Sequence, residues 1–377
     1  MKQDSNLRNN LKSIRTRLGM SQQDLANIAG VTRQTISGVE SGQYAPSVAI
    51  ALRLAKALGC QVEDLFWQDQ DLPQIEAILA KPVPSGHSVR LSLARVGGQW
   101  IAYPLLGKDA FRQDMIPADA EGASQTGDGK VSLRLLDDNL EALHNTVVIA
   151  GCAPVIALWA RATERWHPQL RVHFTFANSI SALQSLCAGK AHIAGMHLYD
   201  PQTGEHNVPF AREVLAGREA VLITLGLWEE GLLVPSGNPK SFKTLSDIVE
   251  AQATIVNREV GAGSRMLLEQ KLQQEQIPFQ ALKGFEQIVT SHQDVAQAIA
   301  LGLVDAGIST ASVAATFGLG FVPLHQSRYD LVILKEYLEE APIQQLLSTL
   351  GHRMVHSQLE VLGGYDISKI GEVVATI

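Results

Sequence analysis

Residues 21–42 read SQQDLANIAGVTRQTISGVESG, and this stretch decides how the first part of the chain folds. Ser21 is followed three positions later by an acidic residue, which is the form of a helix capping box. Gly30 follows the first short helix as a turn residue, and Thr32 is placed to cap a second helix that Gly42 ends. The stretch therefore predicts two short helices joined by a glycine turn.

Apolar residues on both sides of this stretch recur with helical spacing. The set before it is Leu7, Leu11, Ile14 and Leu18, with Gly19 as the stop. The set after it is Ile50, Leu54, Ala57 and Leu58, preceded by Pro46-Ser47. A compact all-α unit over residues 1–67 with two short helices joined by such a turn is typical of a helix-turn-helix that reads DNA.

The stretch from Leu11 to Phe66 resembles the phage repressor/Cro-like (Xre) family. The matching positions are Ile14-Arg15, Gly19, Ser21-Gln22, Leu25-Ala26, Gly30-Val31-Thr32, Ile36, Glu40-Ser41-Gly42, Pro46 and Ala55 to Leu58. The match covers the full length of that domain and predicts double-stranded DNA as a partner. The alternative for this domain is a helical protein-interaction module of the same fold.

The resemblance implies a role for each DNA-facing residue. Residues that would reach base edges are Arg33, Gln34 and Ser37, and residues that would hold phosphates are Gln22, Thr32, Gln43 and Tyr44. Gly38 departs from the family pattern, in which a long polar side chain often reads a base. Arg15 and Glu40 are expected to pair with each other and brace the helices rather than contact DNA.

Charge is distributed unevenly along the chain. The net charge of −7 argues weakly against a nucleic-acid partner, because phosphate contacts need Lys and Arg. Residues 1–67, however, hold eight Lys and Arg against five Asp and Glu, hence +3, whereas residues 68–377 hold 23 against 33, hence −10. The positive charge is concentrated where DNA is expected.

Length and composition favour a cytoplasmic protein of several domains. The chain has 377 residues, no long uncharged apolar run and a polar first stretch, so we expect neither a membrane span nor a signal peptide. Its three cysteines, Cys60, Cys152 and Cys187, are far apart and form neither a disulfide framework nor a zinc-ligand spacing. We expect reduced thiols, no cofactor and no metal site.

Residues 68–140 are predicted to be a connector. Residues 89–96 and 99–105 alternate or run apolar around Gly97-Gly98, which predicts a β-hairpin. Residues 114–130 show no period and predict a mobile loop.

Residues 141–377 alternate short apolar strands with helical stretches, which predicts parallel sheets covered by helices. The strand candidates are residues 147–150, 172–176, 192–196, 254–257 and 305–308. A helix, stop-glycine and strand order at residues 183–195 repeats at 295–307. The repeat predicts a two-lobed α/β domain, each lobe with its own sheet, and a cleft between the lobes.

Small residues follow several strand ends and favour an anion site, because helix N-termini present free N–H groups there. These turns hold Gly151-Cys152-Ala153-Pro154, Asn178-Ser179-Ile180-Ser181, Gly261-Ala262-Gly263-Ser264-Arg265 and Ser309-Thr310. Residues from about 145 to 356 resemble the periplasmic-binding-protein-like domain of cytoplasmic regulators and molybdopterin-synthesis enzymes, and are similar to molybdate-binding proteins in fold. The matching stretches are residues 150–154, 188–198, 257–259, 261–265, 304–307 and 328–331.

The resemblance implies a closing sensor for a small anionic effector, with molybdate or tungstate as the leading class. The candidate ligand-binding residues are Cys152, Ala153, Asn178, Ser179, Ser181, His197, Arg258, Gly263, Ser264, Arg265, Ser309 and Tyr329. Cys152 is more simply a small residue lining the cleft than a nucleophile. His197 could instead only satisfy a hydrogen bond at a strand end. Arg258 and Arg265 could instead brace the lobe, and Asp305 is expected to be structural.

Three functions remain after this comparison. The favoured one is a ligand-responsive transcription regulator, expected as a homodimer or larger homo-oligomer, that is not an enzyme. The second is the same regulator sensing an organic carboxylate. The third is an enzyme of molybdenum cofactor synthesis with Cys152 as nucleophile, against which no base stands at a recognisable spacing and no phosphate loop or H-E-x-x-H motif occurs.

Overall fold

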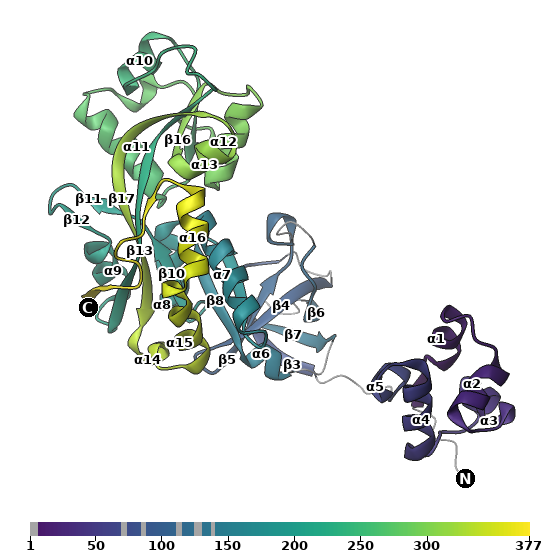
Figure 1. Ribbon diagram of the computed structural model, residues 1–377. Coiled ribbons are helices and arrows are strands. Elements are labelled where there is room, and N and C mark those ends of the chain that lie inside the picture. Colours follow the sequence, from purple (N-terminus) through teal and green to yellow (C-terminus); the bar gives the residue numbers. More distant parts are fainter. Residues whose placement is uncertain (1–6, 69–73, 84–87, 111–114, 124–129, 137–139) are drawn as a thin grey trace. The chain divides into compact units, whose positions relative to one another are not determined.

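The computed structural model describes residues 7–68, 74–83, 88–110, 115–123, 130–136 and 140–377 (Figure 1). The chain divides into two compact units, Met1–Pro73 and Gln74–Ile377. Each has its own hydrophobic core. Within the described residues, no helix is long and apolar enough to cross a membrane.

The first unit is a helical bundle with a short two-stranded ribbon. Its elements are β1 (Leu7–Asn9), α1 (Leu11–Arg17), α2 (Gln22–Ala29), α3 (Arg33–Glu40), α4 (Val48–Leu58), α5 (Val62–Leu65) and β2 (Phe66–Gln68). The Ser21 capping box, the left-handed Gly30 and the Thr32 cap are all present, which confirms the predicted turn. The predicted first helix was wrong at its start, because residues 7–9 pair with β2 instead.

The second unit opens with a closed five-stranded barrel. Its strands, in barrel order, are β3 (Gln74–Leu79), β5 (Gln99–Pro104), β4 (Val89–Val96), β6 (Ala120–Ala123) and β7 (Lys130–Leu135). The β4–β5 pair is the predicted hairpin. The loop predicted at 114–130 was wrong at residues 120–123, which form β6 between β4 and β7, and at residue 130, which begins β7; residues 114 and 124–129 lie outside the described part of the chain.

A ten-stranded sheet forms the body of the second unit. Its main strands, in sheet order, are β15 (Ile288–Val289), β14 (Ile255–Arg258), β16 (Ala306–Thr310), β13 (Ala220–Val234), β17 (Gly320–Leu334), β10 (Ile193–Met196), β8 (Thr146–Gly151) and β9 (Arg171–Phe176). Two further strands, β18 (Tyr365–Asp366) and β19 (Val373–Thr376), pair with β13. The predicted strands pair in parallel within each lobe, as expected.

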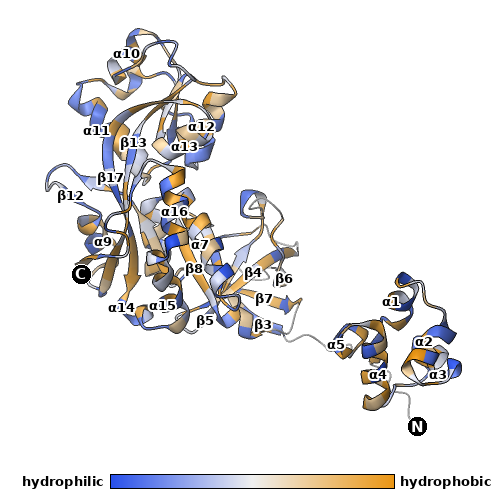
Figure 2. Ribbon diagram, viewed as in Figure 1, coloured by the Kyte–Doolittle hydropathy of each residue, from blue (hydrophilic) through white to orange (hydrophobic). Residues whose placement is uncertain are grey.

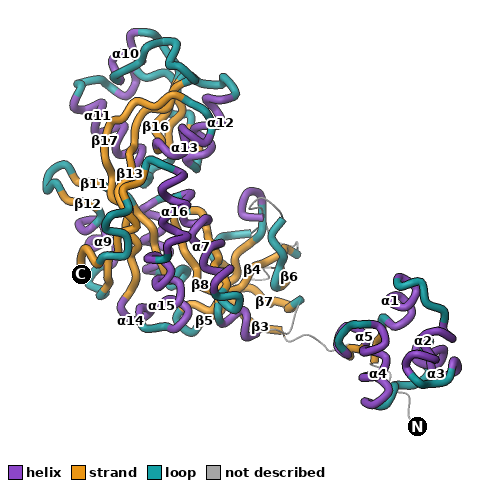
Figure 3. The backbone as a smooth tube through the Cα atoms, in the orientation of Figure 1, coloured by secondary structure: helices purple, strands orange, loops and turns teal. Residues whose placement is uncertain are grey.

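The two lobes share this sheet, which corrects the expectation that each lobe has its own. The long strands β13 and β17 pair antiparallel and run side by side from one lobe to the other (Figure 3). We call residues 140–219 and 335–377 the first lobe, and residues 235–319 the second lobe. The predicted repeat is present in both lobes, because a helix directly precedes β10 in the first lobe and β16 in the second.

Helices cover the sheet in both lobes (Figure 1). Those of the first lobe include α7 (Pro154–Trp166), α8 (Ser179–Cys187), α9 (Val208–Leu215), α15 (Ala341–Ser348) and α16 (Arg353–Leu362), and those of the second are α10 (Leu245–Glu250), α11 (Gly263–Gln274), α12 (His292–Ala300) and α13 (Ala311–Thr316). Apolar residues gather on β8 and its neighbours (Figure 2). The first lobe shares its core with the barrel, through residues such as Tyr103, while the second lobe has separate cores.

Candidate functional site

The helix α3 presents a polar face and buries an apolar one. Arg33, Gln34 and Ser37 are exposed, whereas Ile36 and Val39 are buried in the core of the first unit. The Thr32 hydroxyl accepts a hydrogen bond from the Thr35 amide at 3.1 Å and so fixes the N-terminus of α3. The three predicted base-reading side chains therefore lie on the exposed face of α3.

A buried network holds α1, α2 and α3 together. Glu40 accepts hydrogen bonds from Arg15 Nε at 2.6 Å and from Gln22 Nε2 at 2.8 Å, and Arg15 also donates to the Met20 carbonyl at 2.6 Å. Burial alone would raise the pKa of Glu40, but the bonds from Arg15 and Gln22 outweigh it and lower that pKa. The expected bracing pair of Arg15 and Glu40 is present. The side-chain amide of Gln22, a predicted phosphate contact, donates a hydrogen bond within the domain.

Tyr44 explains the unusual glycine in α3. A Cβ on Gly38 would lie 2.5 Å from the Tyr44 ring, so only glycine leaves room for that ring. The Tyr44 hydroxyl donates to the Thr35 carbonyl at 3.0 Å, while Gln43 is exposed. Gly38 is buried, and the Tyr44 ring fills the space beside it. This position therefore holds no side chain that could read a base.

Seven of the predicted ligand-binding residues lie where the lobes meet β13 and β17, and all seven are buried. They are Cys152, Ser179, His197, Gly263, Ser264, Ser309 and Tyr329. Close packing holds them: a Cβ on Gly263 would lie 2.2 Å from the His197 carbonyl oxygen. The neighbouring Ala153 is the cap residue of α7 and is also buried.

A buried carboxylate lies at the centre of this inter-lobe site. Glu230, on β13, is 1% exposed and accepts hydrogen bonds from Ser264 Oγ at 2.7 Å and Ser327 Oγ at 2.5 Å. The Nδ1 atom of His197 lies 3.1 Å from Glu230 Oε2, and its Nε2 atom lies 3.3 Å from Cys152 Sγ. His197 therefore lies beside Cys152, although no base stands at a recognisable spacing from Cys152 in the sequence.

Glu230 and His197 shift each other's protonation. Burial alone would lower the pKa of His197, but Glu230 and then Cys152 outweigh it and raise that pKa to about 10. Burial alone would raise the pKa of Glu230, and the charge of His197 lowers it instead to about 2. At neutral pH the two groups thus form a buried ion pair.

His292 completes the inter-lobe site from the second lobe. Its ring is fully buried, and its Nδ1 atom lies 3.1 Å from Ser309 Oγ. Its Nε2 atom has no hydrogen-bond partner among the residues that the structure describes. Burial first, and then the charge of Arg258, lower the pKa of His292 well below its usual value.

Sequence reasoning missed Glu230, Ser327 and His292. A signal existed for the first, because Glu229-Glu230 interrupts an otherwise apolar strand of 15 residues. Strand alternation places one of two adjacent side chains on the inner face, so one glutamate had to be buried. For the other two residues nothing in the local sequence marks the site.

Two predicted anion-binding arginines are engaged within the second lobe. Arg258 is buried and donates to Glu259 at 3.1 Å and to the Thr290 carbonyl at 3.0 Å. Arg265 donates to Glu269 at 2.8 Å and to the Arg258 carbonyl at 3.3 Å. Both side chains brace the lobe in this structure. Asp305 has the expected structural role, because it accepts from Lys240 and from the Thr254 amide.

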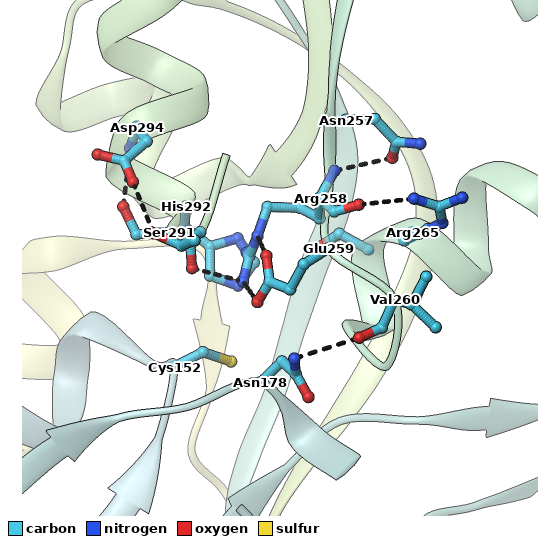
Figure 4. Close-up of polar contacts among 12 residues, drawn as sticks. Cys152, Asn178, Asn257, Arg258, Glu259, Val260, Arg265, Ser291, His292 and Asp294 are labelled. Atoms are coloured by element: carbon cyan, nitrogen blue, oxygen red, sulfur yellow. Dashed lines mark hydrogen bonds and ion pairs between the residues drawn. The ribbon is translucent and has the colours of Figure 1, made fainter. Parts of the chain in front are cut away.

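Asn178 joins the lobes at the N-terminus of α8. Its Oδ1 atom accepts from the Ser181 amide at 2.9 Å, and its Nδ2 atom donates to the Val260 carbonyl at 3.3 Å. Close by, the Ile180 amide donates to the Gly261 carbonyl. In Figure 4, Cys152 and Asn178 face His292, Glu259 and Val260 from the opposite lobe. The lobes therefore touch in this structure.

A cleft of about 1360 Å³ lies beside these contacts and is lined by the barrel and both lobes. Its polar lining includes Asn178, Ser181, Ser185, Thr290, Ser291 and Gln293. Its basic side chains are Lys81, Lys108, Arg161 and Lys190, and its acidic ones are Asp109, Glu259 and Asp294. Each acid pairs with a base, through Lys81–Asp109, Lys108–Asp294 and Arg258–Glu259. Arg161 and Lys190 then leave the lining with a positive balance.

The two parts of the chain match two family models. Residues 160–351 match the PBP superfamily domain, and residues 11–65 match a helix-turn-helix model. The protein YvgK of Bacillus subtilis (strain 168) is 33% identical over 199 residues, covering 53% of this chain, and the chain spans 64% of the length of YvgK. The HTH-type transcriptional regulator YgzD of the same organism is 42% identical over 65 residues, which cover 17% of this chain and 98% of YgzD.

Among solved structures, a phosphate ABC transporter substrate-binding protein with bound phosphate from Clostridium perfringens is 12% identical. The similarity covers 60% of this chain and 99% of that one, with a TM-score of 0.47.

Proposed function

Because the chain belongs to the PBP superfamily and carries an Xre-type helix-turn-helix domain, we propose that its DNA affinity is set by a small anion bound between its lobes. The chain is a DNA-binding transcription regulator with a ligand-binding PBP-like domain, and the relatives of its first unit are named HTH-type transcriptional regulators. An effector changes DNA affinity only if it binds two conformations of the regulator unequally. Closure of the lobes supplies two such conformations.

The cleft beside α8 is the observation that carries this proposal. Residues of the barrel, the first lobe and the second lobe all line it, so a ligand there would lie between the parts that closure brings together. The N-terminus of α8 offers its dipole to an anion, and Arg161 and Lys190 add positive charge. A bound anion would also compete with Asp294 for Lys108, which joins the barrel to α12.

The buried inter-lobe site is a poorer place for an anion. Glu230 already accepts the hydroxyl hydrogen bonds of Ser264 and Ser327, and its charge would repel a second anion. The outer cleft is also large for a tetrahedral oxyanion such as molybdate or tungstate. The volume of the cleft supports an organic carboxylate, which is also an anion, as the second candidate ligand.

Isothermal titration calorimetry on the full chain tests the anion. The panel is molybdate, tungstate, phosphate, chloride, nitrate and a series of di- and tricarboxylates. We expect one class to bind below millimolar concentration and to raise the melting temperature, since it binds only the folded chain. Molybdate binding without carboxylate binding would identify an oxyanion sensor, and the reverse would identify a carboxylate sensor.

Two arginines on α7 provide a matched pair of variants. Arg161→Ala removes a cleft side chain and should weaken the anion by roughly tenfold or more, as for a hydrogen bond to a charged group. Arg165→Ala removes an exposed arginine that is not among the residues lining the cleft and should leave the affinity unchanged. Equal effects of the two changes, or no binding by any anion of the panel, would refute the site.

We propose further that the regulator works as a homodimer in the cytoplasm, where a bacterial-type regulator meets its DNA. One helix-turn-helix reads only a few base pairs, so two copies on half-sites about 10 bp apart are needed for specificity. Sedimentation of the chain with a labelled operator should give two chains per duplex. One chain per duplex, with a footprint over a single half-site, would contradict this.

A further inference from the structure

Three metal-ligand side chains meet at the buried inter-lobe site. They are Cys152, His197 and His292, and their ligand atoms all lie within 4.8 Å of one another. Cys152 and His197 belong to the first lobe and His292 to the second. All three are buried, with exposed fractions of 1%, 3% and 0%. Because they come from three distant parts of the chain, no ligand spacing in the sequence marks them.

We infer that this Cys-His-His cluster binds one divalent transition-metal ion of the zinc class. One thiolate with two imidazoles is a ligand set that zinc prefers, and three protein ligands leave one position open for water or a further ligand. Tetrahedral zinc with such ligands places neighbouring ligand atoms about 3.3–3.6 Å apart. Cys152 Sγ and His197 Nε2 are already 3.3 Å apart. A movement of His292 by about 1 Å completes the geometry.

The hydrogen bonds of His292 leave its metal-facing nitrogen as a free acceptor. The Ser309 hydroxyl donates its proton to the His292 carbonyl at 3.3 Å, so its oxygen accepts from His292 Nδ1–H. A neutral ring protonated on Nδ1 has its lone pair on Nε2, and that atom is buried with no hydrogen-bond partner in the described part of the chain. An unpartnered buried acceptor is costly unless something binds it.

His197 is oriented in the way expected of a metal ligand. Its Nδ1 atom is turned to Glu230 and its Nε2 atom to Cys152, so a bound metal would displace the proton on Nε2 to solvent and leave Nδ1–H donating to Glu230. A carboxylate that accepts from the far nitrogen of a ligating histidine fixes the ring and increases its basicity. Ser264 and Ser327 hold Glu230 in turn. The cluster therefore has an outer shell on both imidazoles.

Charge balance favours a dication at this buried point. A dication with the thiolate of Cys152 and the carboxylate of Glu230 is neutral, whereas a buried site with net charge is costly. The same balance disfavours monovalent copper. It also separates this site from the anion cleft, because Glu230 and the thiolate attract the metal and repel an anion.

A Cys-His-Glu arrangement could also serve a thiol nucleophile, and two observations favour the metal. The sulfur and both imidazoles are buried, so a substrate has no approach in this closed form. A thiol nucleophile needs only one imidazole as its base, yet His292 brings a second imidazole to the same point. The metal would tie the two lobes directly and favour closure.

Metal content and a cobalt spectrum test the inference on the full chain. The chain is stripped with a chelator, loaded with Zn²⁺, desalted and measured by mass spectrometry of elements, and we expect one zinc per chain. Loading with Co²⁺ should give a thiolate-to-cobalt charge-transfer band and the intense visible bands of a tetrahedral site. Less than stoichiometric zinc, or a cobalt spectrum of octahedral oxygen ligands, would overturn the site.

Variants locate the metal at these residues. Cys152→Ser and His292→Gln keep the side-chain volume and should each weaken zinc at least about 100-fold in competition with a chelating dye. Glu230→Gln should weaken it about 10–100-fold. Cys187→Ala removes a half-buried thiol elsewhere in the first lobe and should leave the affinity for zinc unchanged.

Circular dichroism of each variant shows whether it folds, and anion calorimetry on Cys152→Ser separates the two sites. Loss of zinc with anion binding intact supports a distinct metal site. Full zinc binding by folded Cys152→Ser, or loss of zinc in Cys187→Ala instead, would refute it.

Discussion

Glu40→Ala should loosen the helix-turn-helix unit by an amount that its contacts define. Glu40 and Arg15 are only 5% and 11% exposed, and removing one partner of a buried ion pair costs about 3 kcal/mol or more. Gln22 loses its acceptor as well. Amide hydrogen exchange of α1 and α3 in the full chain should therefore accelerate by roughly 100-fold, because 1.4 kcal/mol corresponds to a factor of about ten.

An exposed ion pair provides the control for this change. Glu121 pairs with Arg134 at 2.7 Å in the barrel, but both side chains are about half exposed, at 44% and 55%. Such pairs contribute about 0–1 kcal/mol, so Glu121→Ala should accelerate exchange of its own strands no more than about fivefold. Unchanged exchange of α1 and α3 in Glu40→Ala would refute the reasoning from burial.

The same network predicts an acid dependence. The pKa of Glu40 is lowered on folding, so the stability it contributes is present above its unfolded pKa of 4.5 and is lost as pH falls through the lower folded value. Exchange of α1 and α3 should accelerate in wild type over that acid range. Glu40→Ala should remove this part of the pH dependence, and an unaltered acid limb would show that other carboxylates cause it.

Two further changes test the DNA face and the lobe contact. Arg33→Ala and Gln34→Ala should each cost about 1–3 kcal/mol on the cognate operator with little effect on random DNA in fluorescence anisotropy, and equal losses on both would make them phosphate contacts. Gly261→Ala combines a positive φ of 90° with a Cβ only 2.9 Å from the facing asparagine, so it should disfavour closure in a lobe-to-lobe fluorescence transfer measurement. Gly302→Ala has a similar backbone angle, 68°, in open space, and a comparable opening there would contradict a steric cause.

Local signals were read correctly, and non-local pairings were not. Capping side chains fix the ends of α2 and α3 within four residues, so sequence alone locates the turn. Leu7 fits the helical period equally well, but its strand pairs with residues 66–68, which no local pattern reveals. Residues 120–123 become a strand because the barrel closes around them.

The same limit applies to the inter-lobe site. Cys152 and His197 follow strand ends, where ligand residues are expected in α/β sheets, so they could be predicted. His292 joins them only because the second lobe closes over the first. Glu230 was not among the predicted site residues, because its burial depends on β13 passing through the middle of the sheet.

The shared strands also impose an order on synthesis. The second lobe is one uninterrupted segment between β13 and β17, and much of its core uses residues from 232 to 308. It can therefore assemble while the ribosome is still making β17. The first lobe cannot be completed at that stage, because β10 pairs with β8 on one side but lacks its second neighbour, β17, until residues 330–333 emerge. Pairing across such a separation is slow, so nascent chains should protect the second lobe from protease before the first.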